Sequence, residues 1–418
     1  MMLPAARTEP GHAPFVTALF TATSAVCVTG LSVVDTPTYW SGFGLVLLTV
    51  LSQIGGFGIM TLATLLSLLV SRRLGLRSRL LAQAESAGLF GGNVGGVLVR
   101  VALVMVASES VISVVLALRF WLAYDYSFGR AAWEAVFHAV QAFNNAGFAL
   151  YPDSLVRFVG DWWICVPLAL GVLGGSIGFP VLFELAREWR TPGLWSTHTR
   201  LTVWGTLLFS VSGFLIFLTF EWSNPGTLGP LGTPAKVLAA FTQDVMTRSG
   251  GFNSINLGAM NTETIAVTNA MMFVGGGSAS TAGGIKVTTF LLLAFVIWAE
   301  IRGEPDVVIR KRRIAEATQR QALTVALLGV ALVAAGTLAL IALTDDVPFD
   351  RALFEVTSAF ATVGLSTGIT PQLQSSAQVV LVVLMYVGRV GTIAVGTAIA
   401  LNTRRRLYRY PEERPLVG

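Results

Sequence analysis

The stretch that decides the fold is F-E-V-T-S-A-F-A-T-V-G-L-S, residues 354–366, in which a semi-polar segment leads into a T-V-G-L turn. Three other places share its layout, which is a Phe, nine residues, and then a Gly followed by Leu or Phe. Their glycines are Gly30, Gly147 and Gly251, so that with Gly364 the four glycines are 117, 104 and 113 residues apart. Four copies of one element at a near-constant period indicate an internal repeat.

The residue types of this element suit the binding of a monovalent cation. The triplet T-V-G at 362–364 matches the start of the T-V-G-Y-G loop, whose backbone carbonyls replace the water shell of potassium in channels. Gly permits the backbone angles and the close approach that such a ring of carbonyls needs, and a short helix before each Gly would turn the negative end of its dipole toward the cation. Single x-G-F or x-G-L triplets are common in Gly-rich membrane proteins, but four in register favour a selectivity filter.

The composition places the chain in a membrane. Of 418 residues, 54% are hydrophobic and only 12% are charged, which indicates a polytopic membrane protein. The basic clusters lie between apolar spans and lack interleaved aromatic residues, so they do not predict nucleic-acid binding. The two Cys and three His show no disulfide framework, zinc spacing or H-E-x-x-H motif, and we expect neither an enzyme nor a covalently bound cofactor.

The order of helices follows from the apolar pattern. Short pore helices are predicted at 15–26, 131–143, 234–246 and 349–360, and membrane spans at 40–70, 96–122, 161–185, 198–220, 264–301, 321–343 and 376–401. The span 264–301 is interrupted by V-G-G-G-S-A-S-T-A-G-G-I-K at 274–286, which cannot continue as a regular helix. These elements predict pore units at 1–79, 80–190, 191–315 and 316–418; the third contains the Gly-rich segment and the fourth ends in a cytoplasmic tail.

The basic residues predict the orientation. Clusters at 72–79, 187–200, 302–320 and 404–414 each follow the span after a glycine loop, and the positive-inside bias puts them in the cytoplasm. The glycine loops then lie toward the outer face, each after a re-entrant helix. Non-helical backbone at membrane depth is tolerated only inside the protein or beside water, so four such loops predict a central pore.

Several motifs resemble one family. They are T-S-A-V-C-V-T-G-L at 23–31, Q-A-F-N-N-A-G-F at 141–148, T-R-S-G-G-F-N-S at 247–254, G-G-G-S-A-S-T-A-G-G-I-K at 275–286, S-A-F-A-T-V-G-L-S-T-G at 358–368 and G-R-V-G at 388–391. Over essentially the whole chain they are similar to the Trk/Ktr/HKT superfamily of potassium transporters, and most to the bacterial Ktr-type membrane subunit. The resemblance implies an all-α polytopic protein of the plasma membrane, with four covalently linked helix–pore-loop–helix units around a central pseudo-four-fold pore.

One feature departs from that pattern. The first unit of the family begins with a spanning helix before its pore helix, whereas here the pore helix is expected to begin at residue 15. The segment 1–6 resembles the outer end of such a helix. We therefore expect an incomplete first unit, or a start codon placed too far downstream. Two further N-terminal helices of the larger relatives are also not seen, which favours the Ktr type.

The resemblance also assigns sites. It implies potassium uptake, with ions held by the carbonyls of the four glycines, and an intramembrane loop that closes the pore. Glycine at all four positions resembles the potassium-selective branch, and the sequence leaves open whether sodium acts as an activator. The expected filter residues are Val28, Thr29, Gly30, Asn145, Ala146, Gly147, Ser249, Gly250, Gly251, Thr362, Val363 and Gly364, and the expected gate residues are Gly275, Gly276, Gly277, Ser278, Ser280, Thr281, Gly283, Gly284, Lys286 and Arg389.

Charged and amide residues near these loops carry further expectations. An arginine at mid-span is costly, so Arg389 should face the interior and be paired, for example with backbone carbonyls. The resemblance places it beside the Gly-rich segment, as a barrier to cations. Because a cation lining a cation pore is repulsive, Arg248 should point behind the loops to a carboxylate. The candidate carboxylates are those of Asp244, Glu355 and Glu134; the amides of Asn144, Asn145 and Asn253 should brace the loops; and Asp153, Asp161, Glu221, Asp345 and Asp346 either concentrate cations at the outer mouth or only solvate loops.

Partners and alternative functions complete the expectations. The basic residues Arg72, Arg73, Arg77, Arg79, Arg310, Lys311, Arg312, Arg313, Arg404, Arg405 and Arg406 are explained by topology and lipid contact alone. The resemblance implies in addition a homodimer docked on a cytosolic ring of nucleotide-binding regulatory subunits. The alternative function is a secondary transporter of a small solute, which predicts one or two discontinuous helices rather than four loops. An intramembrane enzyme ranks last, since we find no convincing nucleophile–base pair or ligand set.

Overall fold

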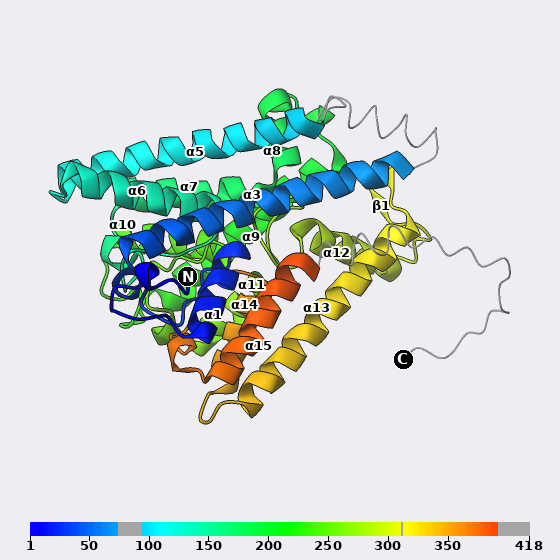
Figure 1. The fold of residues 1–418 in the computed structure, drawn as a ribbon. Helices are drawn as coiled ribbons and strands as arrows, with labels where there is room; N and C mark the ends of the chain where they lie inside the picture. The colour runs from blue at the N-terminus through cyan, green and yellow to red at the C-terminus, as the bar shows by residue number, and fades with distance from the viewer. Residues whose placement is uncertain (74–93, 311, 392–418) are drawn as a thin grey trace.

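The computed structural model describes residues 1–73, 94–310 and 312–391, without the side chains of 59, 60, 62–73 and 94. Within these ranges the fold is almost entirely helical (Figure 1). The elements are η1 (Pro4–Ala6), α1 (Phe15–Val26), α2 (Thr36–Tyr39), α3 (Gly42–Arg73), α5 (Val94–Ala123), α6 (Phe128–Phe143), η2 (Val156–Phe158), α7 (Trp162–Ile177), α8 (Phe179–Glu188), η3 (Pro192–Leu194), α9 (Thr197–Glu221), α10 (Thr233–Thr247), η4 (Leu257–Ala259), α11 (Thr262–Phe273), α12 (Val287–Ile301), β1 (Val308–Ile309), β2 (Arg312–Arg313), α13 (Glu316–Ala342), α14 (Phe349–Phe360), η5 (Thr370–Gln372), α15 (Ser375–Tyr386) and the π-helical turn η6 (Val387–Gly391).

The long helices are apolar enough to cross a bilayer. Among the described residues, α5, α9 and α13 pass by length and composition, and the bent pair α7–α8 adds a fourth if it counts as one span. Large apolar side chains on them, such as Leu122, Trp204 and Leu338, are 62–70% exposed. In a protein without a membrane such exposure would be unfavourable, and it is ordinary for side chains that face hydrocarbon.

The short helices α1, α6, α10 and α14 lie between the long ones. Each begins next to a helix-initiating residue, with Pro14, Ser127 and Pro348 before the first turn and Pro234 inside it. Their burial explains their place in the fold, since α6, α10 and α14 bury most of their residues. The predicted bounds of α1 and α14 are confirmed to the residue, and those of α6 and α10 within three residues.

Each short helix packs against two or three other helices, some of which are distant in the sequence. Helix α1 contacts both α3 and α15, α6 contacts α5 and α7, α10 contacts α9 and α7, and α14 contacts α13, α15 and α11. Figure 1 shows α1 and α15 side by side, although they are more than 300 residues apart in sequence. Residues of α1, α14 and α15 therefore share one core (Phe20, Val356, Phe360, Leu381 and Met385, among others).

Two long apolar segments are broken. The break at 274–286, between α11 and α12, was predicted from its glycines and is confirmed. The break between α7 and α8 was not: the sequence predicted one span over 161–185, whereas the two helices meet at an angle of 103°. Gly178 lies at the corner with a φ of +95°, and Pro180 stands in the first turn of α8. A left-handed Gly followed by Pro ends one helix and starts the next in a new direction.

Candidate functional site

The loops that follow the four short helices have one backbone conformation. We call residues 28–30, 145–147, 249–251 and 362–364 the glycine loops. In each, the first residue has a positive φ (Val28 +55°, Asn145 +61°, Ser249 +73°, Thr362 +47°) and so does the final Gly (+93°, +68°, +76° and +92°), while the residue between them does not. Positive φ at a β-branched residue such as Val28 or Thr362 is uncommon and costs about 1–3 kcal/mol. Its occurrence at equivalent positions in four loops indicates one shared, tightly held geometry.

Main-chain and hydroxyl hydrogen bonds hold these loops to their helices. The middle residue donates its N–H to the carbonyl five residues earlier in three loops, from Thr29 to Ser24 (2.7 Å), from Ala146 to Gln141 (2.8 Å) and from Val363 to Ser358 (2.8 Å). In the first and fourth loops a serine hydroxyl also accepts from the glycine N–H, at 3.0 Å for Gly30 and 3.1 Å for Gly364. The strain of the left-handed residues is thus offset by a repeated set of bonds.

The glycine loops meet one another in a closed ring. A Cβ built on Gly30 would lie 2.1 Å from the carbonyl oxygen of Ala146, and one on Gly147 would lie 2.4 Å from the Cα of Gly251. A Cβ on Gly251 would lie 3.0 Å from the carbonyl oxygen of Val363. A Cβ on Gly364 would lie 2.0 Å from the carbonyl oxygen of Thr29, which belongs to the first loop. Each loop therefore contacts the next in chain order and the fourth contacts the first. Because a Cβ on Gly251 would also lie 2.7 Å from the Cα of Gly147, main-chain atoms exclude a side chain at all four glycines.

The Gly-rich segment 275–286 lies against the helix-side ends of these loops. The Thr281 hydroxyl donates to Oδ1 of Asn145 (3.0 Å), and the Gly283 N–H donates to Oγ of Ser249 (3.2 Å). A Cβ on Gly283 would lie 2.3 Å from the carbonyl oxygen of Ala361 at the end of α14. The segment therefore contacts the second, third and fourth loop regions at once.

The broken helix pair α7–α8 holds the other side of this segment. Gly277 donates its N–H to the carbonyl of Ser176 (2.8 Å), Thr281 donates to Gly175 (3.1 Å), and Phe179 donates to Ala279 (3.3 Å). A Cβ on Gly178 would lie 2.4 Å from the carbonyl oxygen of Ser278. Sequence reasoning missed these α7–α8 residues; the signal was present as G-G-S-I-G-F-P at 174–180, a second Gly-rich interruption in an apolar run.

Arg389 meets the Gly-rich segment, as predicted. Its side chain is 3% exposed, and its Nη1 donates to the carbonyl oxygen of Thr281. Its Nε and Nη2 have no hydrogen-bond partner within the described residues. Lys286 is half-buried at the end of the segment and donates to the carbonyl oxygen of Ala282 at 2.6 Å. Two cationic side chains thus hold adjacent carbonyls of one buried segment.

Arg248 corrects one expectation. The sequence predicted a carboxylate partner. Asp244 does act on Arg248 electrostatically, but the guanidinium donates its hydrogen bonds to the carbonyl oxygen of Thr206 (3.1 Å) and to Oγ of Ser210, both on α9. Neither oxygen of Asp244 has a hydrogen-bond partner within the described part of the chain. An α9 carbonyl lies within reach because Arg248 ends α10, which packs along α9. Arg248 points away from the ring, so that part of the prediction is confirmed.

The other candidate carboxylates have local partners. Glu355 accepts hydrogen bonds from the Ser366 hydroxyl (2.6 Å), the Thr367 N–H (2.9 Å) and the Thr370 hydroxyl (2.7 Å), and so holds the chain just after the fourth loop. Glu134 accepts from Arg130 (2.7 Å) and from the Tyr151 hydroxyl. Neither carboxylate binds Arg248.

The asparagines brace the loops, as predicted. The Asn144 amide donates to Oε1 of Gln53 (2.7 Å) on α3 and to Oε1 of Glu109 (3.0 Å) on α5. Asn145 donates to the Ser176 hydroxyl at 2.5 Å, and Asn253 donates to the carbonyl of Ile255 at 3.0 Å. The second loop is therefore tied to helices on both sides of it.

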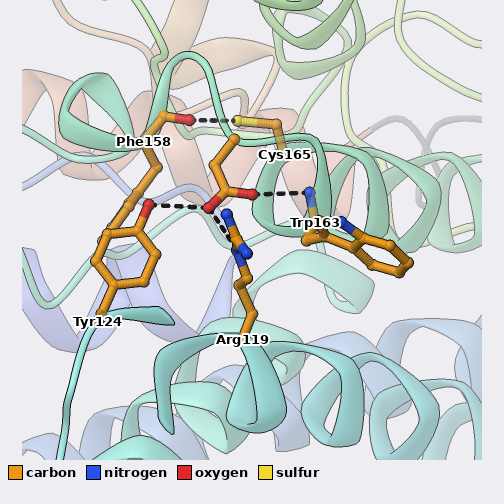
Figure 2. A network of polar contacts seen from close by, with 6 residues as sticks. Arg119, Tyr124, Phe158, Trp163 and Cys165 are labelled. Carbon is orange, nitrogen blue, oxygen red and sulfur yellow. Dashed lines mark hydrogen bonds and ion pairs between the residues drawn. The ribbon is translucent and has the colours of Figure 1, made fainter. Parts of the chain in front are cut away.

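Two of the predicted outer acids are structural. Glu221 is fully buried and accepts from the hydroxyls of Thr227 (2.6 Å) and Thr264 (2.5 Å). Asp161 is 8% exposed, and Figure 2 shows the residues around it, among them Arg119, Tyr124 and Trp163. One carboxylate oxygen accepts from Arg119 Nε (2.8 Å) and the Tyr124 hydroxyl (2.9 Å), and the other accepts from the Trp163 N–H and caps α7. These contacts fix the end of α5 to the start of α7, so neither the cation-concentrating nor the loop-solvating interpretation applies to Asp161 and Glu221.

Replacing Asp161 with alanine should therefore destabilise the protein. The substitution leaves three donors without their acceptor in a buried position. We expect the free energy of unfolding to fall by about 1–3 kcal/mol and the melting temperature in detergent to be lower. Asp153→Ala is the matched control, because Asp153 pairs with Arg157 at 2.7 Å where both side chains are about 40% exposed, and such pairs contribute roughly 0–1 kcal/mol. Equal melting temperatures for the two variants would contradict the structural role.

Comparison with known proteins places the chain in a family. The model of the family described as "TrkH: Cation transport protein" matches residues 5–405. The chain is 39% identical over 420 residues to the Ktr system potassium uptake protein B of Bacillus subtilis (strain 168), covering 100% of this chain and 92% of that protein. It is 36% identical to the protein of the same name from Vibrio alginolyticus, covering 96% of this chain and 88% of that one.

A solved structure agrees with the fold. The crystal structure of the potassium transporter TrkH from Vibrio parahaemolyticus matches with a TM-score of 0.67 and 19% identity, over 94% of this chain and 79% of that chain. At this identity the match shows the arrangement of the helices. By its helical fold, its apolar spans and the family match along nearly its whole length, the chain belongs to the TrkH family of cation transport proteins and is a multi-pass protein of the plasma membrane.

Proposed function

We propose that the protein takes up potassium through the ring of glycine loops, and that Val28, Thr29, Gly30, Asn145, Ala146, Gly147, Ser249, Gly250, Gly251, Thr362, Val363 and Gly364 form its selectivity filter. The observation that carries the proposal is the closed ring of four loops with one alternating φ pattern. Alternation of positive and negative φ turns successive carbonyls toward the same side, whereas in a regular strand they alternate. The relatives named potassium uptake proteins support potassium as the ion.

The chemistry follows from the carbonyl groups. Potassium would enter the ring by exchanging its water shell for the backbone carbonyls of Gly30, Gly147, Gly251 and Gly364 and their neighbours. The four short helices end at these loops, so the negative ends of their dipoles favour a cation there. The protein makes no covalent change; it lowers the barrier to dehydration and supplies a path.

The Gly-rich segment and Arg389 would form the gate. The segment contacts three loop regions through Thr281 and Gly283, and Arg389 holds the Thr281 carbonyl. In this position the segment would block ions sterically while the arginine repels them. Opening then requires the segment to leave the loops, which its glycines allow.

Regulation would come from outside the chain. We expect a homodimer on a cytosolic ring of nucleotide-binding regulatory subunits. Two observations support this: a relative is named as part of a Ktr system, which implies further components, and exposed basic residues lie at the C-terminal ends of α8 and α12 and on β2. Of the basic cluster, residues 72–79, 311 and 404–406 lie outside the described side chains. Fully nucleotide-dependent flux by the purified chain alone would contradict a separate regulator. A relative named potassium/sodium uptake protein, from Enterococcus hirae, makes sodium a second ion to test.

The direct test is growth of a bacterium that lacks its own potassium uptake systems. Expression of the protein together with a Ktr-type regulatory subunit should restore growth at low external potassium. The same strain should take up radioactive rubidium as a potassium substitute. Uptake of an organic solute with no potassium or rubidium flux would favour the secondary transporter, for which the two broken helices are the only support within the described residues.

A further inference from the structure

A large cavity lies apart from the glycine loops. It has a volume of about 1250 Å³ and is enclosed by α8, α9, α12 and the β1–β2 hairpin. None of its lining residues belongs to the loops or to the segment 275–286. Its lining arginines, Arg187, Arg200, Arg310 and Arg312, belong to the basic clusters at 187–200 and 302–320, and in Figure 1 β1 lies near the C-terminal end of α3. We call this cavity the inner pocket; by the positive-inside rule it opens at the cytoplasmic leaflet.

One wall of the inner pocket is apolar, and its side chains are exposed on the surface of the protein. Helix α9 contributes Trp204, which is 62% exposed, and Leu208, which is 59% exposed. Helix α12 contributes Leu291 and Phe295. Both helices belong to the membrane part of the fold, where such surface is in contact with hydrocarbon rather than water. The wall is therefore suited to an acyl chain.

The same face of α9 changes from cationic to apolar along its length. Arg200, Trp204 and Leu208 are spaced four residues apart and share one face. At 1.5 Å per residue they span about 12 Å along the helix. Along this face the guanidinium lies at the cytoplasmic end, the indole comes next, and the aliphatic side chain lies deepest. This order matches that of a phospholipid, whose phosphate is followed by the glycerol region and then the acyl chain.

The polar end of the inner pocket presents arginines. Arg200 is held in place, since its Nη2 donates to the carbonyl oxygens of Pro192 (2.9 Å) and Gly193. Arg310 has a φ of +56° at the turn of the β1–β2 hairpin, is exposed, and makes no hydrogen bond or ion pair among the described residues. Arg187 and Arg312 also line this end. Guanidinium groups bind phosphate oxygens through paired N–H donors.

The two acids of the inner pocket are already occupied. Glu184 accepts from the N–H and hydroxyl of Ser196 and from the Thr199 hydroxyl (2.6 Å), at the start of α9. Glu188 accepts from the Thr191 hydroxyl at 2.8 Å and lies 3.3 Å from Arg187. Both carboxylates are held by neighbouring residues, and among the described residues neither pairs with Arg200 or Arg310.

From this geometry we infer that the inner pocket binds one acidic phospholipid of the cytoplasmic leaflet, with its phosphate between Arg200 and Arg310 and an acyl chain along Trp204 and Leu208. A soluble phosphate would use the arginines and leave the apolar wall uncovered. A zwitterionic lipid would cover the wall but carries no net negative charge for the arginines. Basic pockets between helices on the cytoplasmic side are suited to acidic lipid headgroups.

The test is native mass spectrometry of the purified full chain titrated with lipid. Phosphatidylglycerol should bind as one high-affinity adduct per chain, at least about tenfold tighter than phosphatidylcholine with the same chains. Arg200→Gln and Arg310→Gln should each weaken phosphatidylglycerol binding about fivefold, which corresponds to roughly 1 kcal/mol per basic residue. Phosphatidylcholine binding should not change in either variant.

Two controls distinguish binding in the inner pocket from non-specific attraction of an acidic lipid to any arginine. Arg302→Gln removes the same charge at the cytoplasmic end of α12, where Arg302 is exposed beside Trp298 and does not line the inner pocket; it should leave the affinity unchanged. Glycerol 3-phosphate serves as the soluble probe and should not compete at concentrations near those of the lipid. Equal loss in all three arginine variants, equal affinity for both lipids, or full displacement by glycerol 3-phosphate would each overturn the inference.

Discussion

Replacing Gly364 with alanine is expected to reduce potassium uptake by more than about tenfold, equivalent to over ~1.4 kcal/mol in the barrier. The new Cβ would lie 2.0 Å from the carbonyl oxygen of Thr29 and 3.1 Å from the Cα of Gly251. Both contacts are to main chain, so no flexible side chain can move aside. The φ of +92° adds strain for any residue with a Cβ. The substitution therefore pushes the fourth loop out of the ring.

The neighbouring Gly368 provides the matched control. Its φ is +95°, close to that of Gly364, but a Cβ there would meet nothing within 4 Å. Gly368→Ala tests backbone strain without a clash at the ring, and it should retain most of the uptake. Rubidium uptake into proteoliposomes, normalised to the protein incorporated, measures both variants. If Gly364→Ala were as active as Gly368→Ala, the ring would not be the ion path.

Deleting residues 276–282 is expected to raise potassium flux in the absence of the regulatory subunit. The deletion removes Thr281, which holds the Asn145 side chain and is held by Arg389, and it shortens the segment that contacts three loop regions. If that segment is the barrier, flux without the regulator should approach the level that the intact protein reaches with it. Dependence on the regulator should weaken correspondingly. The measurement is rubidium flux with and without the regulatory subunit.

A double variant shows whether the extra flux uses the glycine loops. Adding Gly364→Ala to the deletion should abolish the gain, whereas an unspecific leak through a damaged protein would persist. Gel filtration of the purified deletion variant reports folding, which is needed because Ser176 and Gly175 lose the donors of Gly277 and Thr281. A well-folded deletion variant whose flux stays at the closed-state value would contradict the gate.

The elements that were predicted correctly are those whose signal is local. The short helices at 15–26 and 349–360 begin beside a proline and end four residues before a loop glycine, so the sequence marks both ends. The interruption at 274–286 was visible because five glycines cannot sustain a helix. Arg389 was expected inside the protein because an unpaired arginine at mid-span is costly.

The misses depend on contacts between distant segments. Gly178 and Pro180 are a local signal for the break in the apolar run at 161–185. The segment about a hundred residues later, to which Gly175, Ser176 and Phe179 bond, is named by no local pattern. Asp244 acts on Arg248 electrostatically, as its nearness in sequence suggested, but packing against α9 gives the hydrogen bonds of Arg248 to that helix, including one to the Thr206 carbonyl. The sequence placed Asp161 among the outer loop acids, whereas the fold brings Arg119 and Tyr124 to its carboxylate (Figure 2).

The position of the transported ion tests the central claim most directly. Crystals grown or soaked with thallium, a potassium substitute with strong anomalous scattering, would locate it. The account predicts an anomalous peak inside the ring, surrounded by backbone carbonyls of the loops that contain Gly30, Gly147, Gly251 and Gly364. A peak between the halves of the broken helices α11 and α12, with the ring empty in a protein that transports thallium, would contradict it.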